Sequence, residues 1–285
     1  MRYSTNKWLM VLAGLVFGMH LQAQSVCYTR EDSLSVVALL KKGSTNPLVY
    51  ARSFIGVPYV AHTLEVNDDE RLVVNLRELD CTTLVENVAA LTLCARTGKT
   101  TFKDFTDMLT MLRYRHGRID GYPSRLHYFS DWIFDNTKKG LVSDIVVNPP
   151  FSGIQKLRLN YMSTHPQAYK ALKNHPELVT TIAAQERHIT GKTIRYIPKS
   201  KIRNTKLMRQ TVKDGDIIAI TCNKKGLDIA HLGFAVWQKD GLHLLNASSI
   251  YHKVVEDTTP LRQYMKQHPS FTGIKILRLR TSKKQ

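Results

Sequence analysis

The stretch "RELDCTTLVENVAALTLCAR", residues 77–96, places a cysteine between an aspartate and two threonines, directly before a helical apolar pattern. A thiol at the first turn of a helix has two interpretations. It is either a small hydrophobic side chain that fills core space, or a nucleophile whose pKa is lowered by the helix N-terminus. The choice depends on whether the rest of the chain supplies chemical partners for Cys81.

A nucleophilic thiol at neutral pH needs a basic partner. A helix dipole contributes only about 0.3–1 kcal/mol, whereas lowering a thiol pKa by about two units takes roughly 2.7 kcal/mol. We therefore expect a histidine to supply the remainder, and Asp80 to act against it unless its side chain points away. Of the 11 histidines, His231 is singled out because it lies in the apolar stretch "AHLGFAVW". A core or edge histidine without chemistry is the alternative.

A third polar residue follows His231 across a predicted hairpin. The turn "QKDG" joins "AHLGFAVW" to "LHLLNASS", since Asp-Gly suits a tight turn. An antiparallel pairing then brings Asn246 within a few rows of His231. A buried amide needs a hydrogen-bond partner, so Asn246 is expected to orient the His231 ring. The order Cys81, His231, Asn246 on helix, strand and strand is that of a papain-like nucleophile set.

The elements that must position these residues change character along the chain. Helical patterns predict helices over 30–43, from 81 onward, over 100–115 and over 130–140, the last with Ser130 as its cap. The stretch "RLVVNLREL", 71–79, alternates like a strand. The last third consists of short β-rich segments joined by turns. Helices followed by an antiparallel meander predict an α+β fold.

The N-terminus predicts export. Basic residues in "MRYSTNK" precede the apolar run "WLMVLAGLVFGMHL", which is shorter than the roughly 20 residues that span a bilayer. We expect a cleavable signal peptide over 1–24, a single domain over 25–285, and a periplasmic or secreted protein without a stable membrane anchor. Bulky Val26 before Cys27 argues against a lipoprotein.

Composition restricts the partners and cofactors. The formal net charge of +18 over 285 residues favours polyanionic surroundings. Export argues against nucleic acid, so an anionic cell wall or lipid surface fits better, with general solubility as the alternative. The four cysteines show neither a CxxC pair nor zinc-like spacing. We expect no metal and no cofactor.

These motifs together resemble a known family. "GVPYV" followed by "LDCTTLVE", "AHLGFAVW" and "NASS" resembles the NlpC-type bacterial cell-wall hydrolases, a papain-like superfamily. "DGYPSRLHYFSDW", "GDIIAI", "GLDIAHLGF" and "LLNASS" are similar to its N-acetylmuramoyl-L-alanine amidase-like branch. The resemblance covers about residues 30–280. It implies a nucleophilic cysteine at a helix N-terminus packed on an antiparallel sheet, with helical insertions over 98–212 lining the cleft.

The resemblance also implies a role for each residue. Cys81 would be the nucleophile, His231 the general base and acid, and Asn246 the group that orients His231, although relatives often carry histidine at that position. Tyr59 would bind substrate or the oxyanion. The implied reaction is hydrolysis of the amide between N-acetylmuramic acid and L-alanine, in peptidoglycan or muropeptide fragments, through a thioester. The alternative is a γ-D-glutamyl–diamino acid endopeptidase acting on the same stem peptides.

A second cluster, "SRLHYFSDW", is predicted to bind substrate. Arg125 would clamp the D-glutamate carboxylate of the stem peptide, since a guanidinium binds carboxylates with two hydrogen bonds. Tyr128 or Trp132 would stack on sugar or peptide, and Asp131 belongs to the same cluster. The alternative is that these aromatic residues anchor the loop to the core.

Overall fold

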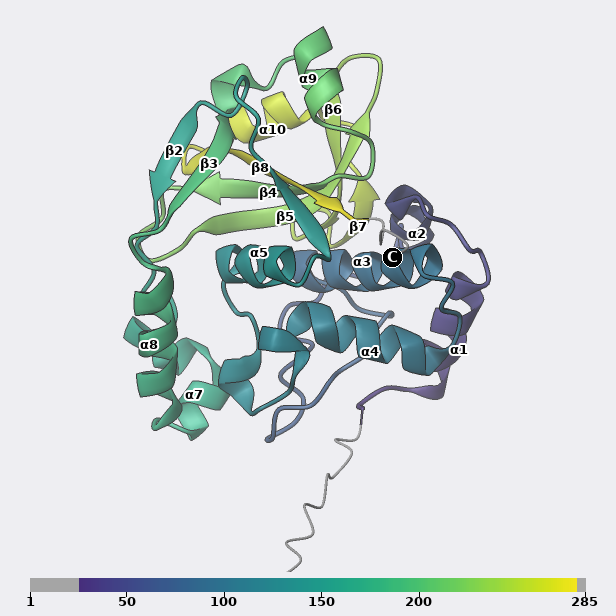
Figure 1. Ribbon diagram of the computed structural model, residues 1–285, viewed down its shortest axis with the longest axis vertical. Coiled ribbons are helices and arrows are strands. Elements are labelled where there is room, and N and C mark those ends of the chain that lie inside the picture. The colour runs from purple at the N-terminus through teal and green to yellow at the C-terminus, as the bar shows by residue number, and fades with distance from the viewer. Residues whose placement is uncertain (1–25, 281–285) are drawn as a thin grey trace, which may run out of the picture.

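The computed structural model describes residues 26–280, so the expected signal peptide over 1–24 lies outside the described residues. The described chain is a mixed α+β structure in which helices lie on both sides of an antiparallel sheet (Figure 1). This confirms the predicted class. The helices are α1 (Arg30–Leu40), α2 (Pro47–Ser53), α3 (Cys81–Arg96), α4 (Phe102–Arg113), α5 (Phe129–Lys138), α6 (Tyr161–Thr164), α7 (Lys170–Asn174), α8 (Leu178–Ile189), α9 (Lys206–Thr211) and α10 (Leu261–Lys266).

Short 3₁₀ turns lie between several of the helices and strands, and the strands are concentrated in the second half of the chain. The turns are η1 (Arg115–Gly117), η2 (Tyr122–Ser124), η3 (Pro166–Ala168) and η4 (Lys199–Lys201). The strands are β1 (Val142–Ile145), β2 (Gly153–Lys156), β3 (Thr193–Pro198), β4 (Ile217–Cys222), β5 (Ile229–Trp237), β6 (Leu242–Ser248), β7 (Lys253–Glu256) and β8 (Phe271–Leu279).

The sheet contains the predicted meander. Its strand order is β2-β3-β8-β4-β5-β6-β7, with β1 also paired to β8. Strands β4 to β7 are antiparallel neighbours in chain order, and β8 returns beside β4. Strands β1, β2 and β3 lie in the span 98–212, for which only helices were expected. The four-residue strands β1 and β2 are too short to show a clear period of two.

The stretch 71–79 was predicted to be a strand, and this prediction is wrong. It pairs only through isolated bridges, Cys27 with Val73 and Tyr59 with Leu79. Three consecutive apolar residues, Leu72 to Val74, are all buried, as are Leu76 and Leu79, while the chain forms no ladder. The apolar pattern therefore reflects burial of an irregular segment rather than one face of a strand.

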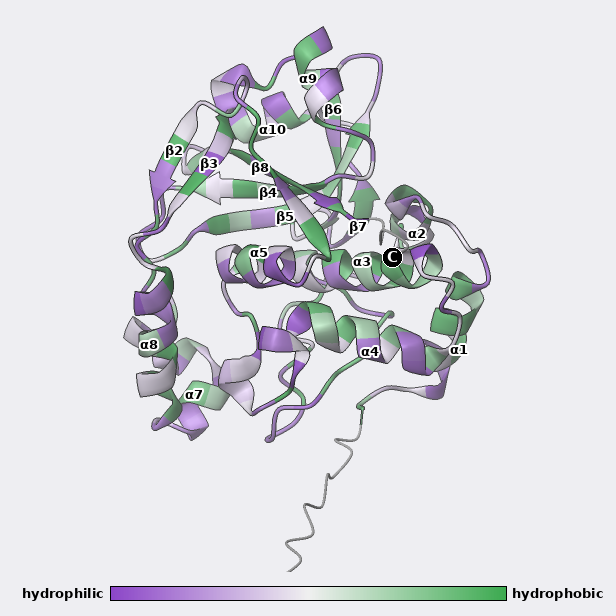
Figure 2. Ribbon diagram, in the orientation of Figure 1, coloured by the Kyte–Doolittle hydropathy of each residue, from purple (hydrophilic) through white to green (hydrophobic). Residues whose placement is uncertain are grey.

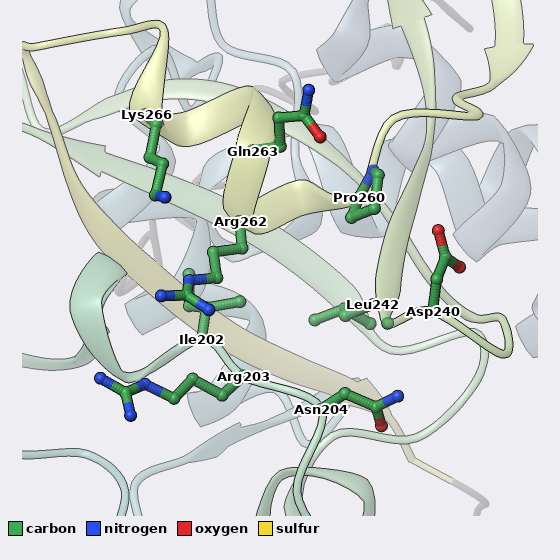
Figure 3. A pocket seen from close by; sticks show the side chains of 10 residues that line it. Ile202, Arg203, Asn204, Asp240, Leu242, Pro260, Arg262, Gln263 and Lys266 are labelled. Atoms are coloured by element: carbon green, nitrogen blue, oxygen red, sulfur yellow. The ribbon is translucent and has the colours of Figure 1, made fainter.

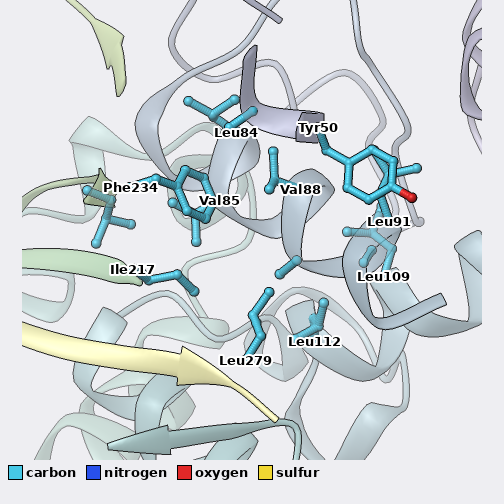
Figure 4. Packing of buried hydrophobic residues seen from close by; sticks show 14 of the residues in the cluster. Tyr50, Leu84, Val85, Val88, Leu91, Leu109, Leu112, Ile217, Phe234 and Leu279 are labelled. Carbon is cyan, nitrogen blue, oxygen red and sulfur yellow. The ribbon is translucent and has the colours of Figure 1, made fainter. Parts of the chain in front are cut away.

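Helix α3 lies at the centre of the larger core. Every residue from Thr83 to Cys94 is buried, so the helix is enclosed on all sides. Figure 4 shows Leu84, Val85 and Val88 among side chains from α2, α4 and the sheet. Figure 2 shows the hydrophobic residues of α3 between the sheet and α4. This packing fixes where the first residue of α3, Cys81, meets the sheet.

A buried ion pair also holds α3 in place. Glu86 of α3 accepts a hydrogen bond from Arg113 Nε at 2.6 Å, and both side chains are almost fully buried. A second nitrogen of Arg113 donates to the carbonyl of Val73 at 2.7 Å. Burial raises the pKa of Glu86, and Arg113 opposes that rise. The pair therefore ties α3 to the end of α4 and to the segment that precedes Cys81.

We expect Arg113→Met to lower the free energy of unfolding by about 3–5 kcal/mol, because it leaves the Glu86 carboxylate buried without its partner. The double substitution Glu86→Leu with Arg113→Met should recover part of this loss. Urea denaturation followed by circular dichroism measures both. Lys103→Met, which breaks the exposed ion pair with Asp107 on the same helix α4, is the control and should leave the midpoint nearly unchanged. Equal midpoint shifts for Lys103→Met and Arg113→Met would contradict the argument.

Candidate active site

The start of α3 is fixed by a capping box. The Asp80 carboxylate accepts a hydrogen bond from the Thr83 backbone N–H at 2.7 Å, and Thr83 Oγ1 accepts one from the Asp80 backbone N–H at 2.9 Å. Cys81 is consequently the first helical residue. Its own N–H has no acceptor within the helix, as is general for the first turn.

His231 and Asn246 meet at the end of the β5–β6 ladder. The paired rows end at Phe234 and Leu245, and beyond them the two residues lie diagonally on one face, since side chains alternate along strands. His231 Nε2 and Asn246 Oδ1 are 2.9 Å apart. The predicted contact is therefore present, and Nδ1 is the ring nitrogen left for another group. The amide oxygen requires that Nε2 carry the proton.

Cys81 and His231 line the same pocket, whose volume is ≈ 180 Å³. The wall opposite α3 comes from the span 98–212 and includes His127, Tyr128, Met162 and Tyr169. The backbone of Leu232, next to His231, forms a hydrogen bond with the Cys81 thiol. The helix N-terminus, the histidine strand and the middle of the chain thus converge on one small enclosure.

The pKa of Cys81 is raised, to about 12, and the sequence-based expectation of a lowered pKa is wrong. Burial is the largest cause, and the Asp80 charge adds to it. Hydrogen bonds from the Leu232 backbone and from Thr82 lower the pKa only in part. Burial also lowers the pKa of His231, although the bond to Asn246 opposes this. At neutral pH the pocket therefore holds a thiol and a neutral imidazole.

Tyr59 lies near Cys81 but not among the residues that line the pocket. Its pKa is raised by burial and next by the Cys81 and Asp80 charges. Two residues that sequence reasoning missed also lie near this site. Burial raises the pKa of Tyr264 to about 12, and the charges of Asp257 and then Cys81 add to this rise. His268 contributes to the lowered pKa of His231. No sequence motif marks the short helix α10 that brings them there.

Asp228 was also missed, and it positions the histidine strand. Its buried carboxylate accepts hydrogen bonds from the backbone N–H groups of Ser130 at 2.7 Å and Ile229 at 2.8 Å. Burial raises its pKa, and these bonds oppose the rise. The prediction that Ser130 caps α5 is wrong, because the helix begins at Phe129 and Ser130 lies inside its first turn. Asp228 thereby joins the start of α5 to the start of β5, three residues before His231.

Arg125 does not line the pocket. It is buried, donates two hydrogen bonds to Glu70 at 3.0 and 2.6 Å, and donates another to Glu65 at 2.7 Å. Its guanidinium also lies over the Tyr122 ring. These internal partners occupy the groups that a substrate carboxylate would need, so the structure argues against Arg125 as a clamp.

The other residues of the predicted substrate cluster have mostly structural contacts. Trp132 is fully buried and stacks on Phe129, which excludes it as a stacking surface for substrate. Asp131 accepts a hydrogen bond from Arg115 at 2.6 Å. Tyr128 does line the pocket, while its hydroxyl donates to Glu186 at 2.7 Å. Only Tyr128 therefore remains a candidate for contact with substrate.

His127 is the neighbouring residue that does face the pocket. Its Nε2 is 2.9 Å from the Tyr122 carbonyl oxygen, so that nitrogen donates the hydrogen bond. Burial, followed by the Arg125 charge, lowers the pKa of His127 to about 3. The ring is thus neutral at physiological pH and leaves one polar nitrogen for a ligand.

Within residues 26–280, no group of three or more His, Cys, Asp or Glu residues is arranged to hold a metal ion. The four cysteines are free thiols. Over the same residues, no helix has both the length and the apolar character needed to cross a membrane.

Comparison with known proteins gives an amidase family and relatives with two different names. The AmiA-like family, described as N-acetylmuramoyl-L-alanine amidase-like, matches residues 49–274. An N-acetylmuramoyl-L-alanine amidase from Bacteroides uniformis ATCC 8492 is 43% identical, with a TM-score of 0.78 over 83% of this chain and 100% of its own. A Bacteroides fragilis protein whose crystal structure carries a xylanase name is 46% identical, with a TM-score of 0.76 over 81% of this chain and 100% of its own.

A Legionella pneumophila protein shares the fold at 22% identity, with a TM-score of 0.68 over 87% of this chain and 94% of its own. None of the curated proteins matches the chain.

Alkylation of Cys81 by iodoacetamide should be slow at neutral pH. Its pKa is raised to about 12, so the thiolate fraction should rise roughly tenfold per pH unit between about pH 6 and pH 9. Peptide mass spectrometry of the alkylated chain measures the rate at each cysteine, and Cys81→Ser removes the adduct of interest. A rate that is already maximal near pH 6 would instead indicate a resting thiolate–imidazolium pair.

Proposed function

The chain belongs to the AmiA-like family of N-acetylmuramoyl-L-alanine amidase-like proteins, and on this basis we propose that it is a cysteine amidase. Its substrate is the amide between N-acetylmuramic acid and L-alanine, in peptidoglycan or muropeptide fragments. The observation that carries the cysteine mechanism is the shared pocket of Cys81 and His231, with Asn246 bonded to the far nitrogen of the ring.

The proposed reaction begins with a neutral pair. His231 Nδ1 accepts the thiol proton as Cys81 Sγ attacks the lactyl carbonyl, and the N–H groups at the start of α3 stabilise the oxyanion. The imidazolium then donates that proton to the leaving L-alanyl amine, which leaves a thioester on Cys81. Water attacks the thioester with His231 as base, and the thiol is restored. Asn246 holds the ring so that Nδ1 faces the sulfur.

The cellular setting of this proposal comes from the N-terminus. The apolar run that follows basic residues supports a signal peptide over 1–24, and hence a periplasmic or secreted enzyme with one domain over 25–285. The papain-like assignment belongs to the same proposal and rests on the order of Cys81, His231 and Asn246. Peptidoglycan lies in that compartment, so the location fits the substrate.

Two other activities need to be considered. A γ-D-glutamyl–diamino acid endopeptidase would use the same three residues on a neighbouring bond of the stem peptide. A xylanase would need two carboxyl groups on either side of a glycosidic bond. Among the described residues that line the pocket, Asp228 is the sole carboxylate, and it is occupied by two backbone N–H groups. The pocket therefore favours amide chemistry.

Mass spectrometry of a muramyl-tetrapeptide incubated with the protein tests the proposal. We expect free tetrapeptide and intact sugar from the natural chain, and no product from Cys81→Ala, because the thioester cannot form. Cys94→Ala is the matched control, since this buried thiol lies on the same helix away from the pocket. A muramyl-dipeptide product would replace the amidase with the endopeptidase, and equal turnover by Cys81→Ala would refute the cysteine mechanism.

Asn246→Ala should lower kcat by about 10- to 100-fold with little change in KM, because His231 loses the partner that orients it. Asn246→His should restore much of the rate, since an imidazole can also accept the Nε2 proton. It should also add a second titration to the pH profile of kcat. Steady-state kinetics from acid to alkaline pH measure this. Failure of histidine to restore activity in a folded variant would contradict the orienting role.

A further inference from the structure

Three pockets surround η4 and α9 at the end of the molecule that is uppermost in Figure 1. The first, of ≈ 370 Å³, lies between η4 and α10 (Figure 3). Arg203 lines both this pocket and the one beside α9, while Asp240 lines both the first and the one beside Trp237. They therefore form one continuous surface, made by 199–209, 238–242 and 260–266, which we call the α9 surface.

The segment that builds this surface is strongly basic. Residues 187–213 contain no aspartate or glutamate, although the whole chain has 23 of these residues. The same segment contains nine lysine and arginine residues: Arg187, Lys192, Arg195, Lys199, Lys201, Arg203, Lys206, Arg209 and Lys213. Five of these nine, Lys199, Lys201, Arg203, Lys206 and Arg209, lie within 199–209 and therefore belong to the α9 surface.

The cations at the centre of the surface are exposed and lack acidic partners. In the part of the chain that the structure describes, the side chains of Lys201, Lys206, Arg262 and Lys266 form no ion pair. Figure 3 shows Arg262 and Lys266 of α10 projecting toward the same pocket. The acid of that pocket, Asp240, is bonded to His243 at 2.8 Å. An anionic partner would meet these cations without displacing an internal carboxylate.

Apolar side chains lie among these cations. Leu207 is 42% exposed between Lys206 and the buried Met208, and it lines the pocket beside α9. Val147, which directly precedes the pocket residue Asn148 in the sequence, is 67% exposed. Figure 2 shows hydrophilic and hydrophobic residues side by side on α9. A soluble polyanion requires only charge, whereas the boundary of a bilayer also accepts apolar side chains.

We propose that the α9 surface docks the protein on an anionic phospholipid bilayer. Lipid phosphates contact the free cations of η4, α9 and α10, and Leu207 enters the headgroup region. The contact is peripheral and reversible, because cations near an anionic leaflet act through screened attraction. The inference does not rest on the amidase reaction. Helix α7, whose first turn follows the pocket residue Tyr169, lies at the opposite end in Figure 1, so docking leaves that side open.

Vesicle sedimentation of the full chain tests the proposal. Binding is compared between vesicles of phosphatidylglycerol mixed with phosphatidylcholine and vesicles of phosphatidylcholine alone. We expect binding to the anionic vesicles at low salt and its loss at about 1 M salt, where the Debye length is about 3 Å. The apolar N-terminal run is the same in every variant, so any salt-insensitive binding that it causes appears equally with both vesicle types and is subtracted.

Matched variants locate the surface. The first variant replaces four cations of the α9 surface by glutamine: Lys201, Lys206, Arg262 and Lys266. The second replaces four exposed cations of the helical side by glutamine: Lys41, Lys99, Arg118 and Lys138. Both remove the same total charge. The first should weaken the salt-sensitive binding more than a hundredfold, at about fivefold per cation, and the second less than about threefold. Equal losses would show that net charge alone binds, and would overturn the proposal.

Leu207→Gln separates a bilayer from a soluble polyanion. If Leu207 enters the headgroup region, this change weakens binding to anionic vesicles severalfold but leaves binding of the chain to polyphosphate unchanged. An unchanged vesicle affinity would mean that the surface recognises charge alone, and the docking proposal would fail. Absence of salt-sensitive vesicle binding by the natural chain would also overturn it. Circular dichroism of each variant confirms that the comparison is made on folded protein.

Discussion

The burial of α3 on every side is the constraint on which the site depends. A helix enclosed by other helices and by the sheet can neither rotate nor slide, so its first residue has one position relative to β5. The Glu86–Arg113 ion pair adds a polar tie to the same packing. The enclosure that positions Cys81 also covers part of its thiol and raises the pKa. Positioning and desolvation are therefore two consequences of one arrangement.

Desolvation decides which mechanism the site can use. A helix N-terminus favours a thiolate, yet here the Asp80 carboxylate that caps the helix lies next to the sulfur and disfavours it. The capping box stabilises α3 at the expense of a preformed thiolate. A neutral thiol and a neutral imidazole also avoid burying two charges, whose desolvation would be costly. In the proposed mechanism the proton therefore moves when the substrate is in place, and the Asn246 bond to His231 matters because the ring must already be aligned.

The sequence allowed the chemistry-bearing residues to be located, because the signals for them are local. A capped helix start, an imidazole in an apolar strand and a two-strand hairpin bring Cys81, His231 and Asn246 close through short-range rules. The contacts of Arg125 could not be predicted from such local signals. Its partners Glu65 and Glu70 lie more than fifty residues earlier, so only the fold reveals that the guanidinium is occupied.

The degree of burial of each side chain is a second property that the sequence did not predict, after the long-range contacts of Arg125. The direction of the Cys81 pKa depends on how much of the chain covers the thiol, and Trp132 became core rather than ligand surface for the same reason. Tyr264 and His268 approach the site only because α10 packs against the sheet.

Charge and chemistry occupy different parts of this molecule. The pocket of Cys81 is built from groups that burial keeps neutral, including His127 and His231. Several unpaired cations lie instead around η4 and α9, where water solvates them. Helix α10 borders both regions, since Arg262 and Lys266 face the basic pocket while Tyr264 lies near Cys81. The net charge of +18 therefore bears on the proposed docking to an anionic surface, whereas the neutral pocket bears on the proposed cleavage of an amide bond.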